Sequence, residues 1–283
     1  MSVPSTARAQ RRQRLLRVAT LTGGMMFAVV SIAAAHDMFA KPDRFFVAEN
    51  AAVIVRVLNG TFSVSSNSIA RPRVQDVSVV SPAGRARLDT SAWSVAGDTS
   101  TFRVQTGTAG TYVVGVSTRP NVIPLTAEQF NGYLKSDGLP DVLAARTRDG
   151  ALNNPARERY HKHIKALIQV GQTRSEHFST ALGYPAEIIP VENPYALSRG
   201  KTLSVRTLVD GAPAGNQYVL YGGRTSSGGR IEQRSVRSDE AGVARIPLRA
   251  SGTWYIKFIH MAPIQGDTVD YESKWATVTF RVP

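Results

Sequence analysis

Alternation with a period of two residues is the feature that most constrains how this chain folds. Between residues 45 and 117, apolar side chains recur at every second position, as in Val53, Val55 and Val57. Successive side chains of a strand point to opposite faces of a sheet, so this pattern predicts strands with one buried face. Turn sequences rich in Gly, Pro and Asp separate the runs at spacings typical of an antiparallel sandwich. We therefore expect a first β-sandwich domain here.

A change of period after Pro124 predicts helices. Thr126 with Gln129 three residues later forms a capping box, which marks the start of a first helix. A second short helix is expected over 140–148. Asn154 and Pro155 offer a cap and a first-turn proline for a third helix that ends at Gly171. The sequence thus predicts a helical segment over about 126–170.

Three prolines within ten residues, Pro185, Pro190 and Pro194, suggest a linker, because each removes a backbone donor from any sheet. Beyond them, the pattern predicts five more strands, over 203–209, 217–221, 243–248, 253–259 and 275–282. The expected fold class is mainly β, with two β-sandwich (immunoglobulin-like) domains. They would occupy 36–184, which carries the helical segment, and 185–283.

The first 35 residues have the pattern of a secretory signal peptide. Four arginines at 11, 12, 14 and 17 precede an apolar stretch over 21–32, and Ala33 to Ala35 provide a processing site. An uncleaved amphipathic anchor is the alternative, but small residues before His36 favour cleavage. We expect a periplasmic protein, and His36 would then be its first residue, with a free α-amino group. The chain has no Cys, so neither disulfides nor a lipid-bearing Cys are expected.

Charge and motifs exclude several classes of protein. The first 35 residues hold five Arg and no acidic residue, which leaves 29 basic and 21 acidic residues in the remaining 248. These basic residues are dispersed without interleaved aromatics, so nucleic acid binding is not expected. No apolar run reaches the roughly 18 residues that a membrane-spanning helix needs. A cysteine nucleophile, a Gly-x-Ser-x-Gly elbow and a phosphate-binding loop are missing, so we do not expect an enzyme.

Seven segments after residue 35 carry a resemblance to a known family. They are His36-Asp37, residues 112–117, EQFNGYLKSDG at 128–138, Glu158-Arg159-Tyr160 with Lys165, PVENPYAL at 190–197, His260-Met261, and residues 270–273 followed by Trp275. Together they resemble the periplasmic domain of unknown function 4198, often labelled a nickel-uptake substrate-specific region. The resemblance covers essentially the whole chain after residue 35, and it implies a secreted, two-part β protein connected, in some members, with nickel or cobalt import.

His36 is the first candidate metal ligand. An N-terminal His can bind one ion through both its α-amine and its imidazole. Nitrogen ligands suit nickel, cobalt and copper ions. The alternative is that His36 only marks the point of cleavage; the family resemblance favours a ligand.

His260 is the second candidate, and Asp270 and Glu272 are the third and fourth. His260 ends an alternating run, and the two carboxylates lie one loop away with equal parity, so they could supply oxygen ligands or orient a His. Their alternative roles are a rim hydrogen bond and loop solvation. His161 and His163 would point apart on a helix, so they are not expected to form a site.

These observations predict a non-enzymatic periplasmic protein that binds nickel, cobalt or copper. It would present the metal to an importer or an outer-membrane receptor. The main alternative is a β-sandwich module for protein or glycan interaction. A copper oxidase with a brace of His36 and a second His is the third hypothesis. The distance between His36 and His260 in the folded chain would distinguish them best.

Overall fold

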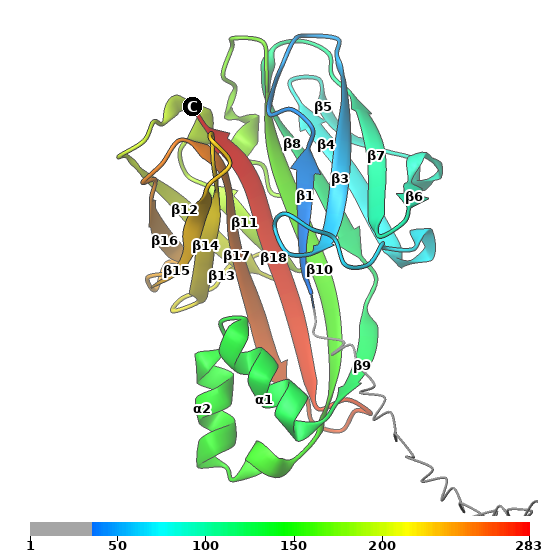
Figure 1. Cartoon of the computed structure of the whole chain (residues 1–283), viewed down its shortest axis with the longest axis vertical. Helices are drawn as coiled ribbons and strands as arrows, with labels where there is room; N and C mark the ends of the chain where they lie inside the picture. Colours follow the sequence, from blue (N-terminus) through cyan, green and yellow to red (C-terminus); the bar gives the residue numbers. More distant parts are fainter. Residues whose placement is uncertain (1–35) are drawn as a thin grey trace, which may run out of the picture. The chain divides into compact units, whose positions relative to one another are not determined.

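A ten-stranded sheet forms the centre of the fold in the computed structural model, which describes residues 36–283 (Figure 1). The predicted signal peptide, residues 1–35, lies outside the described residues. We call this the central sheet. Eight of its strands follow the order β15 (Arg230–Arg237), β14 (Tyr218–Thr225), β17 (Gly252–Pro263), β18 (Tyr271–Val282), β10 (Ala156–Val170), β8 (Gly110–Thr118), β4 (Val74–Ser81) and β5 (Gly84–Arg87), while β2 (Phe46–Val47) and β9 (Asn121–Leu125) also pair with β10.

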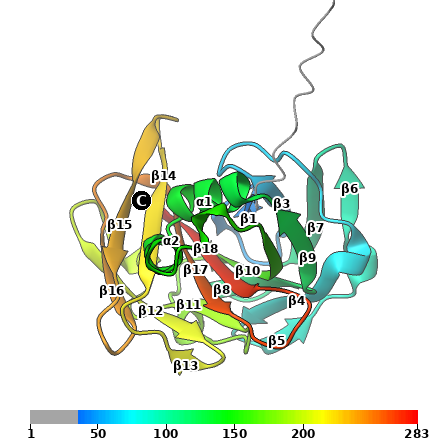
Figure 2. The ribbon, with the colours of Figure 1, turned by 90° about the horizontal axis from the view of Figure 1, so that it is seen from below.

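Two four-stranded sheets accompany the central sheet, and Figure 2 shows them on either side of it. The N-terminal sheet has the order β1 (Asp37–Pro42), β3 (Ala52–Gly60), β7 (Thr99–Gln105) and β6 (Ser94–Ala96). The C-terminal sheet has the order β11 (Ala186–Pro190), β12 (Thr202–Val209) and β13 (Ala212–Pro213), with β16 (Val243–Pro247) also paired to β12. The mainly β, sandwich-type fold class is confirmed.

The two outer sheets pack against opposite faces of the central sheet. On β10, Ile164 and Ile168 belong to the core shared with the N-terminal sheet, whereas Leu167 belongs to the core shared with the C-terminal sheet. On β8, Val114 and Val113 divide in the same way. We call the side of β10 that carries its even-numbered residues the N face and the other side the C face. β10 is therefore buried from both sides along most of its length.

The predicted third helix is wrong, because residues 156–170 form strand β10. Its last ten residues, from His161 to Val170, are all buried, which leaves no polar face and no period of two. A strand covered on both faces resembles a buried helix in sequence. β10 also pairs in parallel with β18, a neighbour more than 100 residues away along the chain. Such pairing leaves no local signal in the sequence.

The predicted domain boundary between residues 184 and 185 divides the two outer sheets but not the central sheet. It separates the strands of the N-terminal sheet from those of the C-terminal sheet, but the central sheet takes strands from both parts. The described residues, 36–283, form one compact unit, so two independent sandwiches do not describe this part of the chain. Pro190 is tolerated because β11 is an edge strand that pairs with β12 alone within its sheet.

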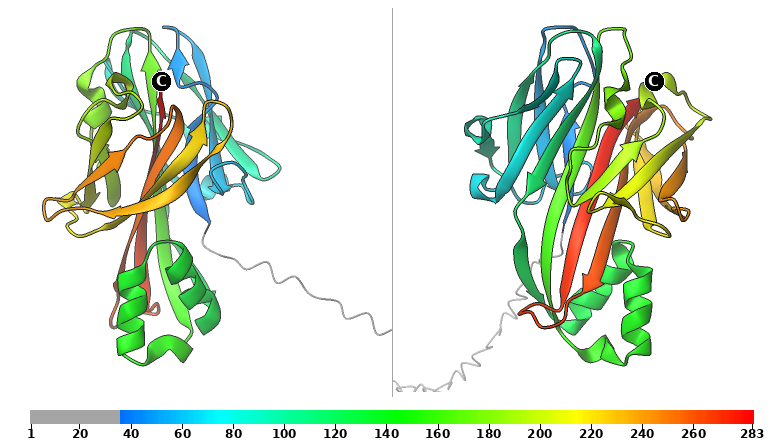
Figure 3. Two further views of the ribbon diagram at one scale, coloured as in Figure 1. Left: turned by 60° about the vertical axis from the view of Figure 1, so that its left-hand side comes forward. Right: turned by 180° about the vertical axis from the view of Figure 1, so that it is seen from behind.

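The first two predicted helices are confirmed as α1 (Ala127–Ser136) and α2 (Pro140–Arg148). Thr126 and Gln129 form the expected capping box, with Gln129 N donating to Thr126 Oγ1 at 3.2 Å. Both helices lie at one end of the long strands β10, β17 and β18 (Figures 1 and 3). α1 buries Phe130 and Leu134 in a core that includes Trp275. Within residues 36–283, no helix is long and apolar enough to cross a membrane.

Candidate functional site

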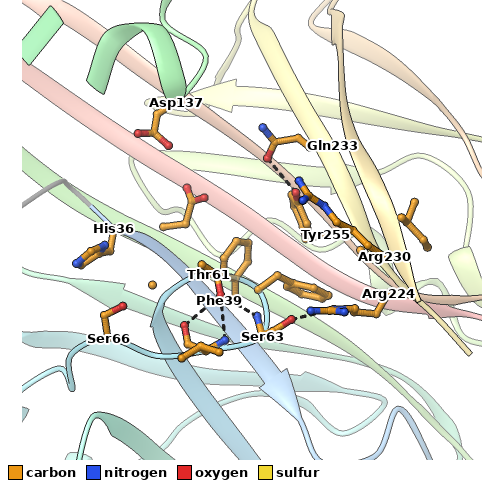
Figure 4. A pocket seen from close by; sticks show the side chains of 16 residues that line it. His36, Phe39, Thr61, Ser63, Ser66, Asp137, Arg224, Arg230, Gln233 and Tyr255 are labelled. Carbon is orange, nitrogen blue, oxygen red and sulfur yellow. Dashed lines mark hydrogen bonds between the residues drawn. The ribbon is translucent and has the colours of Figure 1, made fainter. Parts of the chain in front are cut away.

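A cavity of about 590 Å³ opens where six separate segments meet: the start of β1, the loop after β3, the end of α1, and β14, β15 and β17. Figure 4 shows the side chains that line it. Those that carry chemistry are His36, Asp37, Thr61, Ser63, Ser66, Asp137, Arg224, Arg230, Gln233 and Tyr255. Charged groups gather at two ends of this cavity, which we call the histidine end and the arginine end.

His36 lies at the histidine end and is fixed there through its backbone. Its carbonyl accepts a hydrogen bond from the buried ammonium of Lys162, which also donates to Asn59 Oδ1 at 3.1 Å. Burial lowers the pKa of Lys162 to about 8. Partial burial, and then the charge of Lys162, lower the pKa of the His36 imidazole. At neutral pH the ring is therefore mainly uncharged, which is the form that ligates metals.

Two carboxylates share one buried lysine next to His36. Lys257 Nζ donates to Asp37 Oδ2 and lies 3.5 Å from Asp137 Oδ1. The other oxygen of Asp37, Oδ1, is buried and has no hydrogen-bond partner among residues 36–283. Burial raises the pKa of Asp137, and Lys257 opposes that rise. This end thus offers one neutral nitrogen and one unpartnered carboxylate oxygen, but little net negative charge.

The arginine end is formed by strands β14 and β15. Arg224 donates to Ser63 Oγ at 3.0 Å and to Gly228 O at 3.2 Å, and it has no carboxylate at ion-pair distance among the described residues. Arg230 lies 3.4 Å from Glu232, and both side chains are exposed. Lys41 is near, since the charge of Arg224 contributes, after burial, to lowering the pKa of Lys41. This end therefore carries excess positive charge.

Three packed aromatic rings form the floor between the two ends. The rings of Phe39 and Phe62 lie 5.2 Å apart, and Tyr255 lies 5.2 Å from the first and 4.9 Å from the second. All three are buried, so they act as rigid support rather than as an exposed stacking platform. The hydroxyl of Tyr255 donates to Gln233 Oε1 at 2.9 Å, which connects the floor to the middle of β15.

The structure does not bring His260 to His36. Both Lys257 and His260 are on β17, but three positions apart, so their side chains point to opposite faces. Lys257 points to the N face, where it contacts Asp37, and His260 points to the C face. There, His260 is paired with Lys274 of β18, which is paired in turn with His161 of β10. The predicted pairing of His36 with His260 is wrong.

Asp270 and Glu272 also lie apart from His36. Asp270 closes a loop, since its carboxylate accepts from Arg157 N at 2.7 Å and its own N–H donates to Arg157 O at 2.8 Å. Glu272 lies on β18 on the C face, where its charge raises the pKa of His161 against a larger effect of burial. Within residues 36–283, no three His, Asp or Glu side chains are arranged as a preformed metal site.

The charged cavity residues Asp137, Arg224 and Arg230 were not among the predicted site residues, nor was Lys257, which contacts Asp37 and Asp137 beside the cavity. Asp137 follows the end of α1, and Lys257 is the one charged residue in an apolar strand. A Lys in an otherwise apolar strand indicates a polar or charged partner, and for Lys257 that partner is a carboxylate. Which carboxylate that is depends on the pairing of distant strands, for which the sequence contains no local sign.

Residues 33–262 match the family described as a domain of unknown function (DUF4198). The chain belongs to this family. No curated protein matches the sequence of this DUF4198 member. The cavity residues from His36 to Tyr255 all fall inside the matched range. The cavity is therefore formed by residues of the family domain. Strand β18 lies outside the matched range and does not line the cavity.

Similar solved structures include a trypsin-activated alpha-2-macroglobulin from Escherichia coli, at 10% identity and a TM-score of 0.22, over 88% of this chain and 16% of that one. The BSP domain of a biofilm-associated protein matches at 10% identity and a TM-score of 0.20, over 86% of this chain and 29% of that one. A tetra-tandem repeat from the extending region of a large adhesion protein matches at 12% identity and a TM-score of 0.20, over 87% and 49%. The DUF4198 chain spans less than half the length of each.

Proposed function

We propose that this DUF4198 protein is a non-catalytic periplasmic binding protein. Its ligand would be a transition-metal ion, nickel or cobalt, held together with a carboxylate-bearing organic chelator in the His36 cavity. One observation carries the proposal: a neutral imidazole beside an unpartnered carboxylate oxygen lies at one end of the cavity, and two guanidinium groups lie at the other. A ligand with a metal at one end and carboxylates at the other complements both.

The size of the cavity supports a chelate rather than a bare ion. Its volume is about 590 Å³. A water molecule takes up about 30 Å³ of liquid, and a metal ion with one or two waters would leave most of this space empty. Pockets for small organic ligands typically measure about 300–1,000 Å³. The cavity therefore has the size expected for an organic molecule that carries the ion.

The number of protein ligands points the same way. His36 offers an imidazole nitrogen, and cleavage after Ala35 would add the α-amine as a second nitrogen. Asp37 Oδ1 could add one oxygen, while Lys257 already occupies the other oxygen of Asp37 and also contacts Asp137. Nickel and cobalt accept such mixed nitrogen and oxygen sets. The chelator would complete the coordination that the protein leaves open.

The arginine end would recognise the chelator. A guanidinium group presents parallel N–H donors that match the two oxygens of a carboxylate. Arg224 has no carboxylate partner among the described residues, so its charge is available to a ligand. The protein would then present the chelate to an importer or to an outer-membrane receptor. The alternative role, as a module for protein or glycan interaction, would need neither His36 nor a metal.

Calorimetry on the chain that begins at His36 tests this function. The ligands are Ni²⁺ alone, citrate alone, and an equimolar mixture of the two. We expect the mixture to bind at least tenfold more tightly than either component. His36→Ala should remove the advantage of the metal, and Arg224→Gln should weaken binding of the mixture about tenfold or more, since one charged hydrogen bond contributes about 1.5–3 kcal/mol.

Arg234→Gln is the matched control. Arg234 is an exposed arginine on β15, the strand next to that of Arg224, but it does not line the cavity. Its replacement should leave the affinity unchanged. Equal binding of citrate with and without Ni²⁺ would favour the interaction module, and no binding of any of the three would refute the proposed site.

A further inference from the structure

Two histidines lie side by side, almost completely buried, on the face of β10 opposite the His36 cavity. His161 is 7% exposed and His163 is 2% exposed. Residues two apart on a strand share a face, and the rings of this pair meet edge to face at 4.9 Å between centroids. On the predicted helix the two side chains would point apart, whereas on strand β10 they share one face.

Both rings carry a buried nitrogen without a partner. Nε2 of His161 and Nε2 of His163 have no hydrogen bond within the described residues. A buried polar atom without a partner destabilises the fold, so two of them on adjacent rings call for a ligand that satisfies both. The ring of Tyr184 lies 5.7 Å from that of His163, and Lys274 of β18 is opposite His161 in the register. Lys165 and Lys274 are each held by a carboxylate, Glu187 and Asp210, which leaves the two nitrogens to a ligand.

The second nitrogen of His163 is already oriented. Its Nδ1 lies 2.9 Å from Ser117 Oγ on the adjacent strand β8. In the tautomer that donates from Nδ1 to this hydroxyl, the lone pair is on Nε2, as in metal-ligating histidines that are fixed by a second hydrogen bond. Burial also lowers the pKa of His163 to about 3 and lowers that of His161, so both rings are neutral at physiological pH.

A carboxylate of the next strand can complete a site. Glu272 lies on β18, opposite Arg159 in the register, and therefore diagonally next to His161 on the same face. Its side chain is partly buried, and it would have to turn toward the rings to become a ligand, because the three groups do not form a preformed site within residues 36–283. Lys274 follows on the same face and forms an ion pair with Asp210. This pair leaves Glu272 without a competing lysine among the described ion pairs.

We propose a second metal site in which the Nε2 atoms of His161 and His163, with the carboxylate of Glu272, bind a transition-metal ion that prefers imidazole, copper above zinc. It is separate from the proposed chelate site, because β10 and the central sheet lie between the two. Two nitrogens and one oxygen on a rigid strand pair suit Cu²⁺, which stands highest among the divalent ions in affinity for such ligands. The site would hold the metal without a chelator.

Electron paramagnetic resonance of bound Cu²⁺ tests this site in a His36→Gln background, which removes the first site. We expect one equivalent of Cu²⁺ coupled to two imidazole nitrogens. His161→Gln and His163→Gln should each remove one of these couplings and weaken binding at least tenfold, and Glu272→Gln should weaken it less. His177→Gln is the matched control, because His177 lies near Ser175 and outside the site, and it should change nothing.

Circular dichroism shows whether the other variants fold. If they do not, the spectrum of the His36→Gln protein alone tests the second metal site. No bound Cu²⁺, or coupling to fewer than two imidazole nitrogens, would overturn the proposal. An unchanged spectrum in folded His161→Gln would overturn it as well. Failure here leaves the His36 site standing, since the calorimetric test of that site uses different residues.

Discussion

The two faces of β10 each bury a lysine, and the two lysines differ in the charge of their partners. On the C face, Lys165 forms an ion pair with Glu187, and both side chains are at most 3% exposed. On the N face, Lys162 is 4% exposed and contacts two uncharged acceptors, the His36 carbonyl and Asn59 Oδ1. It has no carboxylate at ion-pair distance among the described residues. The C face balances its charge internally, whereas the N face does so incompletely and next to a cavity, as a binding site would.

Breaking the internally balanced pair should have the largest effect. Glu187 also accepts hydrogen bonds from three backbone N–H groups, of residues 182, 183 and 184. Glu187→Ala would strand the buried ammonium of Lys165 and leave these donors unpaired. We expect the free energy of unfolding to fall by about 3–5 kcal/mol, measured by urea denaturation.

Glu192→Ala is the control for this prediction. Glu192 is exposed and accepts one backbone N–H, that of Ser204, at 2.8 Å. Its loss should cost about 1 kcal/mol. Similar losses for the two variants would show that the buried pair is not the stronger element.

An intermediate effect is expected from Glu158, a buried carboxyl on the N face. Burial raises its pKa, although Ser273 and Tyr133 donate to it. The neutral form is thus favoured in the folded state, and its contribution is complete below the unfolded pKa of about 4.5. It is lost as pH rises through the folded pKa, at about 1.4 kcal/mol per pH unit.

Glu158→Gln should remove this slope. Urea denaturation of the wild type and the variant at several pH values from 4.5 to 7.5 measures it, and the difference in stability should grow in favour of the variant as pH rises. Two parallel curves would contradict the assignment of a raised pKa to Glu158.

The smallest effect is expected from Lys162→Met. No buried carboxylate loses an ion-pair partner, and the costly burial of an ammonium is removed, so the stability should change by about 1 kcal/mol or less. The pKa of His36 should rise, because the charge of Lys162 contributes to lowering it. Proton NMR titration of the His36 ring measures this shift. A loss of stability as large as that of Glu187→Ala would erase the contrast between the two faces.

The sequence predicted most of the strands and two of the helices. Alternation at Val53, Val55 and Val57 indicated β3, and the capping box at Thr126 indicated α1. Burial on both faces does not by itself hide a strand, since residues 253–259 and 275–282 were predicted although β17 and β18 are mostly buried. β10 was missed because Asn154 and Pro155 have the pattern of a helix start, and a long buried run after them fits a helix as well as a strand.

The candidate site was predictable only in part, for a related reason. His36 was found because its position in the chain is itself informative. Its partners were not, since the parity that places Lys257 toward Asp37 and His260 away from it has meaning only after β17 is paired with β18. The pairing of distant strands decides which side chains meet, and no local pattern in the sequence indicates that pairing.

Anomalous X-ray diffraction at the nickel absorption edge tests the central claim most directly, on crystals of the chain that begins at His36, grown with Ni²⁺ and citrate. The account predicts a peak at ligand distance, about 2.1 Å, from an imidazole nitrogen of His36, with carboxylate density against Arg224 and Arg230. A peak only at His161 and His163, or no peak in the cavity, would contradict it.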